Sequence, residues 1–423
     1  MIYRETLDYL FGLQRFGIKL GLHNTQRLLE RLDHPERCAP VIHVAGTNGK
    51  GSVCAGLARV LREAGLRVGL YTSPHLHSFT ERIRVDERCI SEAEVVCLTG
   101  ALRQCAGDLP LTFFEFTTAM ALHYFREQRV DFMVLEVGMG GRLDATNVVQ
   151  PRITVITPVS EDHAEHLGPD LASIAREKAG ILKPGVPLVL APQAPEALAE
   201  IERLAQNMDA PVRRAGRDFH VVRRGEAFDF LGSGLRLTDV LPRLAGAHQR
   251  DNLGVVLAVV DLLREQGTAL DEQAVRRAIE NVDWPGRLER WPGVPPVLLD
   301  GAHNRAGAEA LAAYLAECRL GKLPWVLGLS GKRRPENICG PWLPHLAAAY
   351  VAEPGVDKAV ASEDIGDYLR GQGCAATPCV SPTAALQQAL AEWPRAPLVV
   401  VAGSLYLVAE VRDWLMKNPQ VSA

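Results

Sequence analysis

The sequence has no CxxC pair, no long apolar run and no excess of basic residues, and each absence excludes a class of protein. Its nine cysteines are scattered and odd in number, which argues against a disulfide framework or a zinc knuckle and favours reduced thiols in a cytoplasm. No run approaches the roughly 18 apolar residues of a membrane span, and the charged first residues do not resemble a signal peptide. A net charge of −4 argues against nucleic acid as a partner.

What the sequence does contain is a long alternation of strand-like and helix-like segments. At 423 residues it exceeds a usual single domain, so we expect two. The alternation predicts an α/β fold built on a doubly wound, mostly parallel sheet. A stretch rich in Pro, Gly and Trp at 283–296 interrupts the pattern, which then restarts and predicts a smaller second α/β domain. The polar, broken run from 212 to 238 predicts short antiparallel strands on the first domain.

The stretch "VIHVAGTNGKGSVCAGL", residues 41–57, reads as strand, glycine loop and helix. This order directs backbone N–H groups and the positive end of a helix into one concavity, where Lys50 can meet the outer phosphates of a nucleotide. Ser52 is placed to cap the helix or to meet a metal ion. The spacing departs from GxxxxGK[ST], because Val44 occupies the first glycine position and Gly51 separates Lys50 from the serine. The competing interpretation is a strand-to-helix turn with an incidental lysine.

Other polar residues follow further predicted strands, and in a doubly wound sheet ligands bind outside those strand ends. Ser73 follows "VGLY", Glu136 ends "FMVLE", and His163 follows "ITVITPVS" by a few residues. Oxygen ligands beside a phosphate loop suit Mg²⁺. In the second half, Asp300 ends "VLLD" and His303 follows it. The sequence therefore predicts polar groups at strand ends in both domains.

Several residues have a structural interpretation that competes with the functional one. Lys178 lies on a short helix, where a solvated lysine paired with Glu165 or Glu177 is the ordinary expectation. Asn252 precedes a long apolar helix and is either an adenine contact or an N-cap. Asp300 is either a site residue or an N-cap. Sequence physics alone leaves these alternatives open.

The ordered set of motifs resembles the folylpolyglutamate synthase family, and specifically its bacterial bifunctional dihydrofolate synthase/folylpolyglutamate synthase members, which are Mur-ligase-like ATP-dependent amide ligases. The resemblance covers nearly the whole chain. It rests on "HVAGTNGKGS", "TSPHL", "ERIRVD", "TFFEFTTAMAL", "EVGMGGRLDATN", "EDHAEHLG", "REKAGILKPG", "AGAHQRDN", "PGRLE", "DGAHN" and "VVAGSLYLVAEVR".

The resemblance implies a set of site residues that the sequence physics did not settle. It implies that ATP is bound by Gly49, Lys50, Gly51, Ser52, Asn252, Arg287 and Asp300. It implies Mg²⁺ ligands at Ser73, Glu136 and His163, with a monovalent cation as a further expectation. It implies a pterin and dihydropteroate pocket at Gly21, Leu22, His23, Thr112, Phe113, Phe114, Glu115, Leu143, Asp144 and Ala145. Family members often have an acidic residue where His23 stands, and "LSGKRRPEN" at 329–337 departs from the family pattern.

The family chemistry implies catalytic residues and an architecture as well. Lys178 is similar to a family lysine that becomes carbamylated, and Lys50 and His303 complete the expected catalytic set. The expected architecture is a P-loop ATPase-type domain with the folate pocket at 1–286, a linker at 287–296 and a Rossmann-like glutamate ligase domain at 297–423. The expected substrates are dihydropteroate, reduced folates, L-glutamate and ATP, and a monomer is expected. The implied reaction passes through an acyl phosphate, and closure of the two domains would exclude water from it.

Three other functions compete with this interpretation. A Mur peptide ligase would share the ATP site but usually has a further N-terminal domain, for which the roughly 40 residues before the phosphate loop are too few. A nucleotide-hydrolysing switch is the alternative from another class, and no NKxD-type guanine motif is visible. A silent binding protein on the same fold is disfavoured by Lys50, Glu136 and His163.

Overall fold

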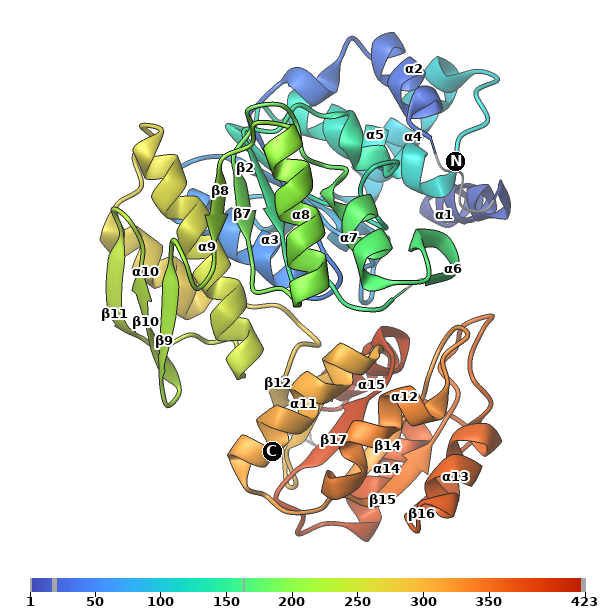
Figure 1. Cartoon of the computed structure of the whole chain (residues 1–423). Helices are drawn as coiled ribbons and strands as arrows, with labels where there is room; N and C mark the ends of the chain where they lie inside the picture. Colours follow the sequence, from blue (N-terminus) through green and yellow to red (C-terminus); the bar gives the residue numbers. More distant parts are fainter. Residues whose placement is uncertain (1, 17–20, 163, 420–423) are drawn as a thin grey trace. The chain divides into compact units, whose positions relative to one another are not determined.

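The computed structural model describes residues 2–16, 21–162 and 164–419 (Figure 1). The chain forms two compact units, each built around its own sheet. The first comprises residues 1–243 and 249–282, and the second comprises 244–248 and 283–423.

The first unit contains an eight-stranded sheet in the order β4-β3-β2-β5-β1-β6-β7-β8. The six strands from β2 to β8 run parallel, and β3 and β4 add an antiparallel edge. Figure 1 shows helices on both faces of the sheet, so the predicted doubly wound architecture is confirmed. The strands are β1 (Val41–Ala45), β2 (Val68–Tyr71), β3 (Ile83–Val85), β4 (Arg88–Cys89), β5 (Phe132–Glu136), β6 (Ile153–Ile156), β7 (Leu188–Leu190) and β8 (Val212–Arg214).

The helices of this unit follow apolar periodicity and capping signals in the sequence. They are α1 (Tyr3–Gly12), α2 (His23–Arg31), α3 (Lys50–Glu63), α4 (Glu92–Ala106), α5 (Phe113–Glu127), α6 (Ala164–Leu167), α7 (Leu171–Ala179), α8 (Pro195–Asn207), α9 (Ala247–Glu265) and α10 (Glu272–Asn281). Short 3₁₀ turns are η1 (Leu13–Phe16), η2 (Pro35–Arg37), η3 (Phe79–Arg82) and η4 (Ala145–Val148). Within the described ranges, no helix is both long and apolar enough to cross a bilayer.

The run from 212 to 238 divides between two sheets. Val212–Arg214 forms β8, which joins the large sheet in parallel, so this part of the antiparallel prediction is wrong. The rest forms a separate antiparallel sheet of β9 (His220–Arg224), β10 (Ala227–Leu231) and β11 (Arg236–Val240), as expected.

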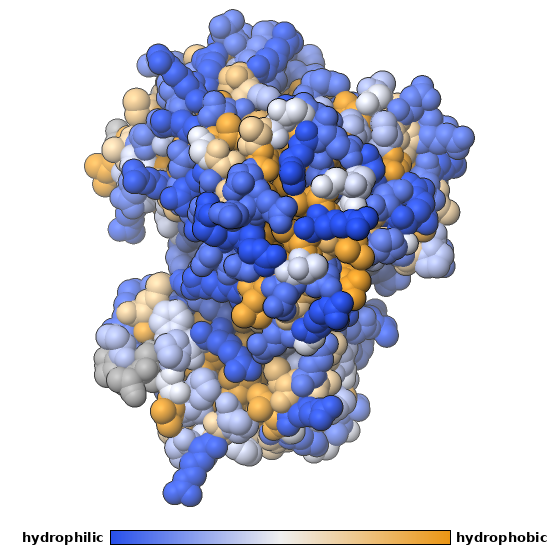
Figure 2. Space-filling model, turned by 90° about the vertical axis from the view of Figure 1, so that its left-hand side faces the viewer, coloured by the Kyte–Doolittle hydropathy of each residue, from blue (hydrophilic) through white to orange (hydrophobic). Residues whose placement is uncertain are grey.

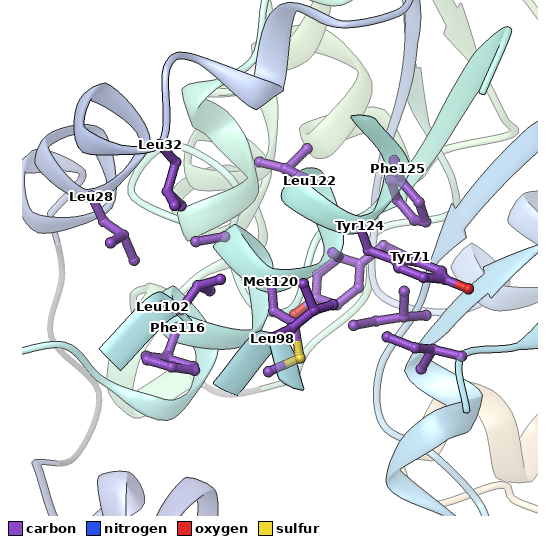
Figure 3. Packing of buried hydrophobic residues seen from close by; sticks show 14 of the residues in the cluster. Leu28, Leu32, Tyr71, Leu98, Leu102, Phe116, Met120, Leu122, Tyr124 and Phe125 are labelled. Atoms are coloured by element: carbon purple, nitrogen blue, oxygen red, sulfur yellow. The ribbon is translucent and has the colours of Figure 1, made fainter. Parts of the chain in front are cut away.

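A large apolar cluster fixes the helices near one edge of the sheet (Figure 3). Leu98 and Leu102 of α4 pack with Phe116 and Met120 of α5, and each is at most 4% exposed. The hydroxyl groups of Tyr71 and Thr117 lie 3.0 Å apart and connect β2 to α5. This packing holds the first turn of α5 beside the carboxyl ends of the strands.

The second unit contains a six-stranded sheet in the order β12-β13-β17-β14-β15-β16, parallel except for β12. Its strands are β12 (Glu289–Trp291), β13 (Val297–Asp300), β14 (Leu323–Leu327), β15 (Leu346–Val351), β16 (Ala375–Pro378) and β17 (Val399–Ala402). Its helices are α11 (Arg305–Cys318), α12 (Pro335–Cys339), α13 (Ser362–Gly371), α14 (Pro382–Glu392) and α15 (Leu405–Lys417), with the 3₁₀ turn η5 (Gly340–His345).

The face shown in Figure 2 is mostly hydrophilic, with hydrophobic residues gathered toward its middle. The most exposed large apolar side chains, Val380 at 97% and Val294 at 81%, are far apart in the sequence.

Candidate active site

The loop after β1 is tied to the segment that follows β6. The Thr47 N–H donates to the Pro158 carbonyl at 3.0 Å. The Thr47 hydroxyl donates to the Ser160 carbonyl at 3.0 Å and accepts from the Ser160 N–H at 3.1 Å. Gly46 lies so close to Thr157 that a β-carbon there would overlap the threonine hydroxyl. Only glycine fits this approach, which brings the loop backbone against the neighbouring strand end.

Lys50 is the first residue of α3 and lies over this loop. Its Nζ donates to the carbonyls of Gly46 and Thr47 at 3.2 and 3.0 Å. Gly49, at φ 85°, is the N-cap, and the first turn of α3 continues with Gly51 and Ser52. The prediction that Ser52 caps the helix is therefore wrong, because this side chain is 2% exposed inside the first turn. The helix N-terminus and the lysine together make the loop electropositive.

Asn252 contacts the same loop from α9. A β-carbon on Gly49 would overlap the Asn252 side-chain amide, whose Nδ2 donates to Gln249 Oε1 at 3.0 Å. The residue lies within α9 and not before it, so the N-cap interpretation is wrong. The amide is 5% exposed and directed at the phosphate loop by its neighbour in the helix.

Glu136 and Ser73 meet at the carboxyl ends of β5 and β2. The Ser73 N–H donates to Glu136 Oε2 at 3.0 Å, and the glutamate is 4% exposed. Glu136 pairs with Val44 in the sheet, which places it beside the start of the phosphate loop. The charges of Glu136 and Lys50 both affect the Cys54 thiol. Burial and then Glu136 raise the thiol pKa well above its usual value, and Lys50 opposes this rise. Glu136 therefore lies beside the strand that leads into the phosphate loop of Lys50.

A carboxylate and a hydroxyl are oxygen donors of the kind that Mg²⁺ prefers, so Glu136 and Ser73 fit that ion. The third predicted ligand, His163, lies outside the described residues. In the part of the chain that is described, no three His, Cys, Asp or Glu side chains come together as a complete metal site.

Lys178 is buried, so the interpretation as a solvated helical lysine is wrong. It is 4% exposed, and its Nζ donates to the Gly46 carbonyl at 2.8 Å, the same oxygen that Lys50 contacts. Burial and then the Lys50 charge lower the Lys178 pKa to about 7, against smaller opposing effects of nearby aspartates. Glu177, the expected partner, pairs with Arg142 at 3.0 Å. The Lys178 side chain is therefore a partly neutral amine beside the phosphate loop at neutral pH.

The predicted pocket residues at the start of α5 form a capping box. The Thr112 N–H donates to Glu115 Oε2 at 2.7 Å, and the Glu115 N–H donates to Thr112 Oγ1 at 3.3 Å. Phe113 stacks on Phe11 with centroids 5.6 Å apart. The Phe114 ring lies against Gly138, where a β-carbon would overlap it. The two phenylalanines thus flank a helix start that the capping box fixes.

The other predicted pocket segments approach this helix start. Gly21, Leu22 and His23 lie at the beginning of α2, where Leu22 is the N-cap. Asn24 Nδ2 donates to the Pro110 carbonyl at 3.4 Å, which connects this turn to the residues before Thr112. Leu143, Asp144 and Ala145 lie in the segment that follows β5 and leads into η4.

A buried hydrogen-bond chain that sequence reasoning missed fixes Asp144. Asp144 Oδ2 accepts from the Met139 N–H at 2.9 Å, and Oδ1 accepts from the Thr146 hydroxyl at 2.5 Å. The same hydroxyl lies 2.8 Å from His43 Nε2. Since Thr146 gives its hydrogen to the carboxylate, His43 must donate from Nε2. Burial lowers the His43 pKa to about 3, which keeps the ring neutral. The signal was a histidine inside the apolar strand "VIHVA".

Replacing Thr146 by valine is expected to lower the free energy of unfolding by about 1–3 kcal/mol, because it leaves the buried His43 donor without its acceptor. Equilibrium urea denaturation measures the change. Thr146→Ser is the matched control: it keeps the hydroxyl and should lose less stability than the valine variant. Equal stability of the two variants would contradict this role of the chain.

The second unit gathers Asp300, Arg287 and His303 at the end of β13. Asp300 Oδ2 accepts from the Leu288 N–H at 2.8 Å, and Oδ1 accepts from the Ala302 N–H at 2.9 Å. Burial raises the Asp300 pKa, and the nearby Arg287 opposes that rise. His303 Nδ1 lies 2.8 Å from the Gly301 carbonyl. The N-cap of α11 is Asn304, so the capping interpretation of Asp300 is wrong.

Comparison with known families identifies both units. Residues 44–260 match the Mur ligase middle domain, and residues 286–405 match the Mur ligase glutamate ligase domain. A dihydrofolate synthase/folylpolyglutamate synthase of Bacillus subtilis is 40% identical over 330 residues, which cover 74% of this chain and 76% of that protein.

Solved structures agree with this match. E. coli FolC in complex with DHPP and ADP superposes with a TM-score of 0.90 at 31% identity, over 98% of each chain. A Yersinia pestis folylpolyglutamate synthase/dihydrofolate synthase with AMPPNP and a Mn ion superposes with a TM-score of 0.89 at 31% identity, again over 98% of each chain.

Proposed function

The chain belongs to the folylpolyglutamate synthase/dihydrofolate synthase family of ATP-dependent ligases with Mur ligase domains, and from that premise we propose its substrates. It adds L-glutamate to 7,8-dihydropteroate, and to the γ-carboxylate of reduced folates. The observation that supports this most directly is the grouping of Lys50, Glu136 and Lys178 around one phosphate loop.

The nucleotide is the substrate that the phosphate loop binds. Gly49, Lys50, Gly51 and Ser52 contact its phosphates through backbone N–H groups, the ammonium and the hydroxyl. The approach of the Asn252 amide to Gly49 supports a nucleotide contact from α9. Arg287 and Asp300 of the second unit are proposed as further nucleotide contacts. Asp300 ends strand β13 and Arg287 lies near it, and ligands of parallel α/β sheets bind at such strand ends.

Glu136 and Ser73 would hold the divalent ion, with His163 as the proposed third ligand. When bound, the ion supplies positive charge that offsets the charge on the transferring phosphoryl group. The Ser73 N–H helps to orient the buried Glu136 carboxylate. A monovalent cation is a further proposed occupant of the site.

Lys178 is proposed to be carbamylated. Its neutral amine adds to CO₂: an N–C bond forms, one C=O π bond of CO₂ breaks and one proton is released, so that a neutral amine becomes an anionic carbamate. Burial supports this, because it lowers the amine pKa to about 7 and so populates the nucleophilic form at neutral pH.

The pteridine end of the substrate is proposed to bind between the start of α5 and the segment after β5. Thr112, Phe113, Phe114 and Glu115 form one wall, with the predicted residues at 21–23 and 143–145 nearby. The aromatic rings and the buried Asp144 carboxylate suit a flat, hydrogen-bonding heterocycle. The binding of DHPP by the E. coli relative supports the same ligand class here.

The reaction proceeds in two steps. The substrate carboxylate attacks the γ-phosphorus of ATP, giving an acyl phosphate and ADP, while Lys50 stabilises the charge on the phosphoryl oxygens. The glutamate amine then attacks the acyl carbon, and the tetrahedral intermediate loses phosphate and a proton to give the amide. His303 is proposed to orient the incoming glutamate. Residues 1–286 would bind ATP and folate and 297–423 would bind glutamate, with 287–296 as the linker.

We further propose a cytoplasmic monomer. All nine cysteines are free thiols, as a reducing compartment favours.

A single assay tests the proposed function against its rivals. With ATP, dihydropteroate and L-glutamate, ADP release should depend on both acceptor and amino acid, and mass spectrometry should detect dihydrofolate. Glutamate-independent ADP release would favour a nucleotide-hydrolysing switch. A requirement for a UDP-sugar acceptor would favour a Mur peptide ligase.

A further inference from the structure

The segment from Ser73 to Arg82 is a rigid connection between the two halves of the proposed site. The Glu81 carboxylate accepts from the backbone N–H groups of Leu76, His77 and Ser78 at 2.8, 2.9 and 2.9 Å. The Thr72 N–H donates to the Arg82 carbonyl at 3.0 Å, which closes the segment onto the end of β2. The backbone of this segment is therefore held by its own hydrogen bonds.

His75 is the side chain that this arrangement orients most specifically. Arg82 Nε donates to His75 Nδ1 at 2.8 Å, so the neutral ring carries its hydrogen on Nε2. Because Nδ1 accepts this hydrogen bond and carries no hydrogen, the ring is uncharged in this arrangement and its Nε2–H is a donor.

The position of His75 relates it to the substrate. It follows Ser73, the proposed metal ligand, by two residues, and its ring centroid is 6.4 Å from Phe11 and 6.5 Å from Phe79. Both of these phenylalanines contact Phe113 of the proposed pteridine wall, at 5.6 and 6.2 Å. The ring therefore lies beside the aromatic residues that contact the proposed pteridine wall and is two residues from the proposed metal ligand, so it is near both ends of the proposed site.

We infer that His75 is a substrate-binding residue whose Nε2–H donates to the arylcarboxylate that becomes phosphorylated, and that Arg82 is a positioning residue acting through the histidine. This inference rests on the proposed function. A neutral donor suits the task, because it orients the carboxylate without neutralising it, and the carboxylate has to remain a nucleophile. Arg82 is 8% exposed, and its guanidinium carbon lies 5.2 Å from the centroid of the Phe113 ring, a contact that helps to orient the guanidinium.

The test compares two replacements of His75 in the full-length enzyme. His75→Phe keeps a ring without a donor and should raise KM for dihydropteroate about tenfold, with KM for ATP unchanged. His75→Gln keeps an N–H and should recover part of that loss. His77→Ala, two residues along the same segment and exposed, is the matched control and should behave as wild type. Equal KM for dihydropteroate in His75→Phe and wild type would overturn the inference.

Arg82→Lys tests the positioning role, because it keeps the charge but lacks the Nε–H that fixes the histidine. This variant should raise KM for dihydropteroate by itself and add nothing in the His75→Phe background. A further loss in the double variant would show that Arg82 contacts substrate directly and would overturn its role as a positioning residue.

A binding measurement separates failure of this inference from failure of the proposed function. Calorimetric titration of dihydropteroate into wild type and His75→Phe, with a non-hydrolysable ATP analogue present, needs no turnover. Weaker binding to the variant alone supports the inference, and equal affinities overturn it even when wild type is active. Absence of binding to wild type overturns both.

Discussion

The enzyme with alanine at position 50 is expected to form amide at a rate lower by on the order of 10³-fold or more. Lys50 supplies the ammonium group of the phosphate loop, and its Nζ lies within 3.2 Å of two loop carbonyls. The backbone N–H groups and the helix N-terminus remain in the variant, so nucleotide should still bind. The loss should therefore fall mainly on kcat, with a smaller rise in KM for ATP. ADP release with dihydropteroate and glutamate measures both.

A matched control separates the local charge from the net charge of the protein. Lys417 pairs with Asp413 near the end of α15, and Lys417→Ala removes the same charge without touching the phosphate loop. That variant should turn over as wild type does. Near-normal turnover by Lys50→Ala would show that the lysine does not act on the phosphates, and the assignment of the loop would fail.

The neighbouring positions of the ends of β1 and β5 could be predicted from the sequence. A doubly wound sheet brings the carboxyl ends of its parallel strands to one edge, so Glu136 and the phosphate loop were expected to be neighbours. Glu136 of β5 pairs with Val44 of β1, just before the phosphate loop, because these two strands are adjacent in the sheet. The proximity of Glu136 to the phosphate loop therefore follows largely from knowing which segments form strands.

Other features depended on contacts between residues far apart in the sequence, and periodicity does not report such contacts. Lys178 is buried because α7 packs beside a loop 132 positions earlier, and its local sequence reads like any amphipathic helix. Asn252 resembled a helix cap in the sequence because the residues around it are polar. In the structure it lies inside α9, and its side chain is buried against Gly49. His75 belongs to the motif "TSPHL", but its orientation depends on a hydrogen bond from Arg82, seven residues further along the chain.

Lys178→Met is expected to lower kcat by on the order of 10²-fold, because it removes the amine while an unbranched side chain of similar length fills the space. In wild type, activity should rise with added bicarbonate after CO₂ has been removed. The rise should be larger at pH 8 than at pH 6, since the amine with its pKa of about 7 is mostly protonated below that value and cannot add CO₂. Carbon-13 NMR with labelled bicarbonate should detect the carbamate in wild type and not in the variant.

Lys183 gives this experiment its control. It is a second lysine whose pKa is lowered by burial, and its Nζ donates to the Asn147 carbonyl at 3.3 Å, away from the phosphate loop. Lys183→Met should keep both the bicarbonate response and the carbamate signal. If that variant loses them, the modified amine is Lys183. If activity is insensitive to bicarbonate and Lys178→Met turns over normally, a carbamate has no part in the reaction, and the shared contact of Lys50 and Lys178 with the Gly46 carbonyl serves only to hold the loop.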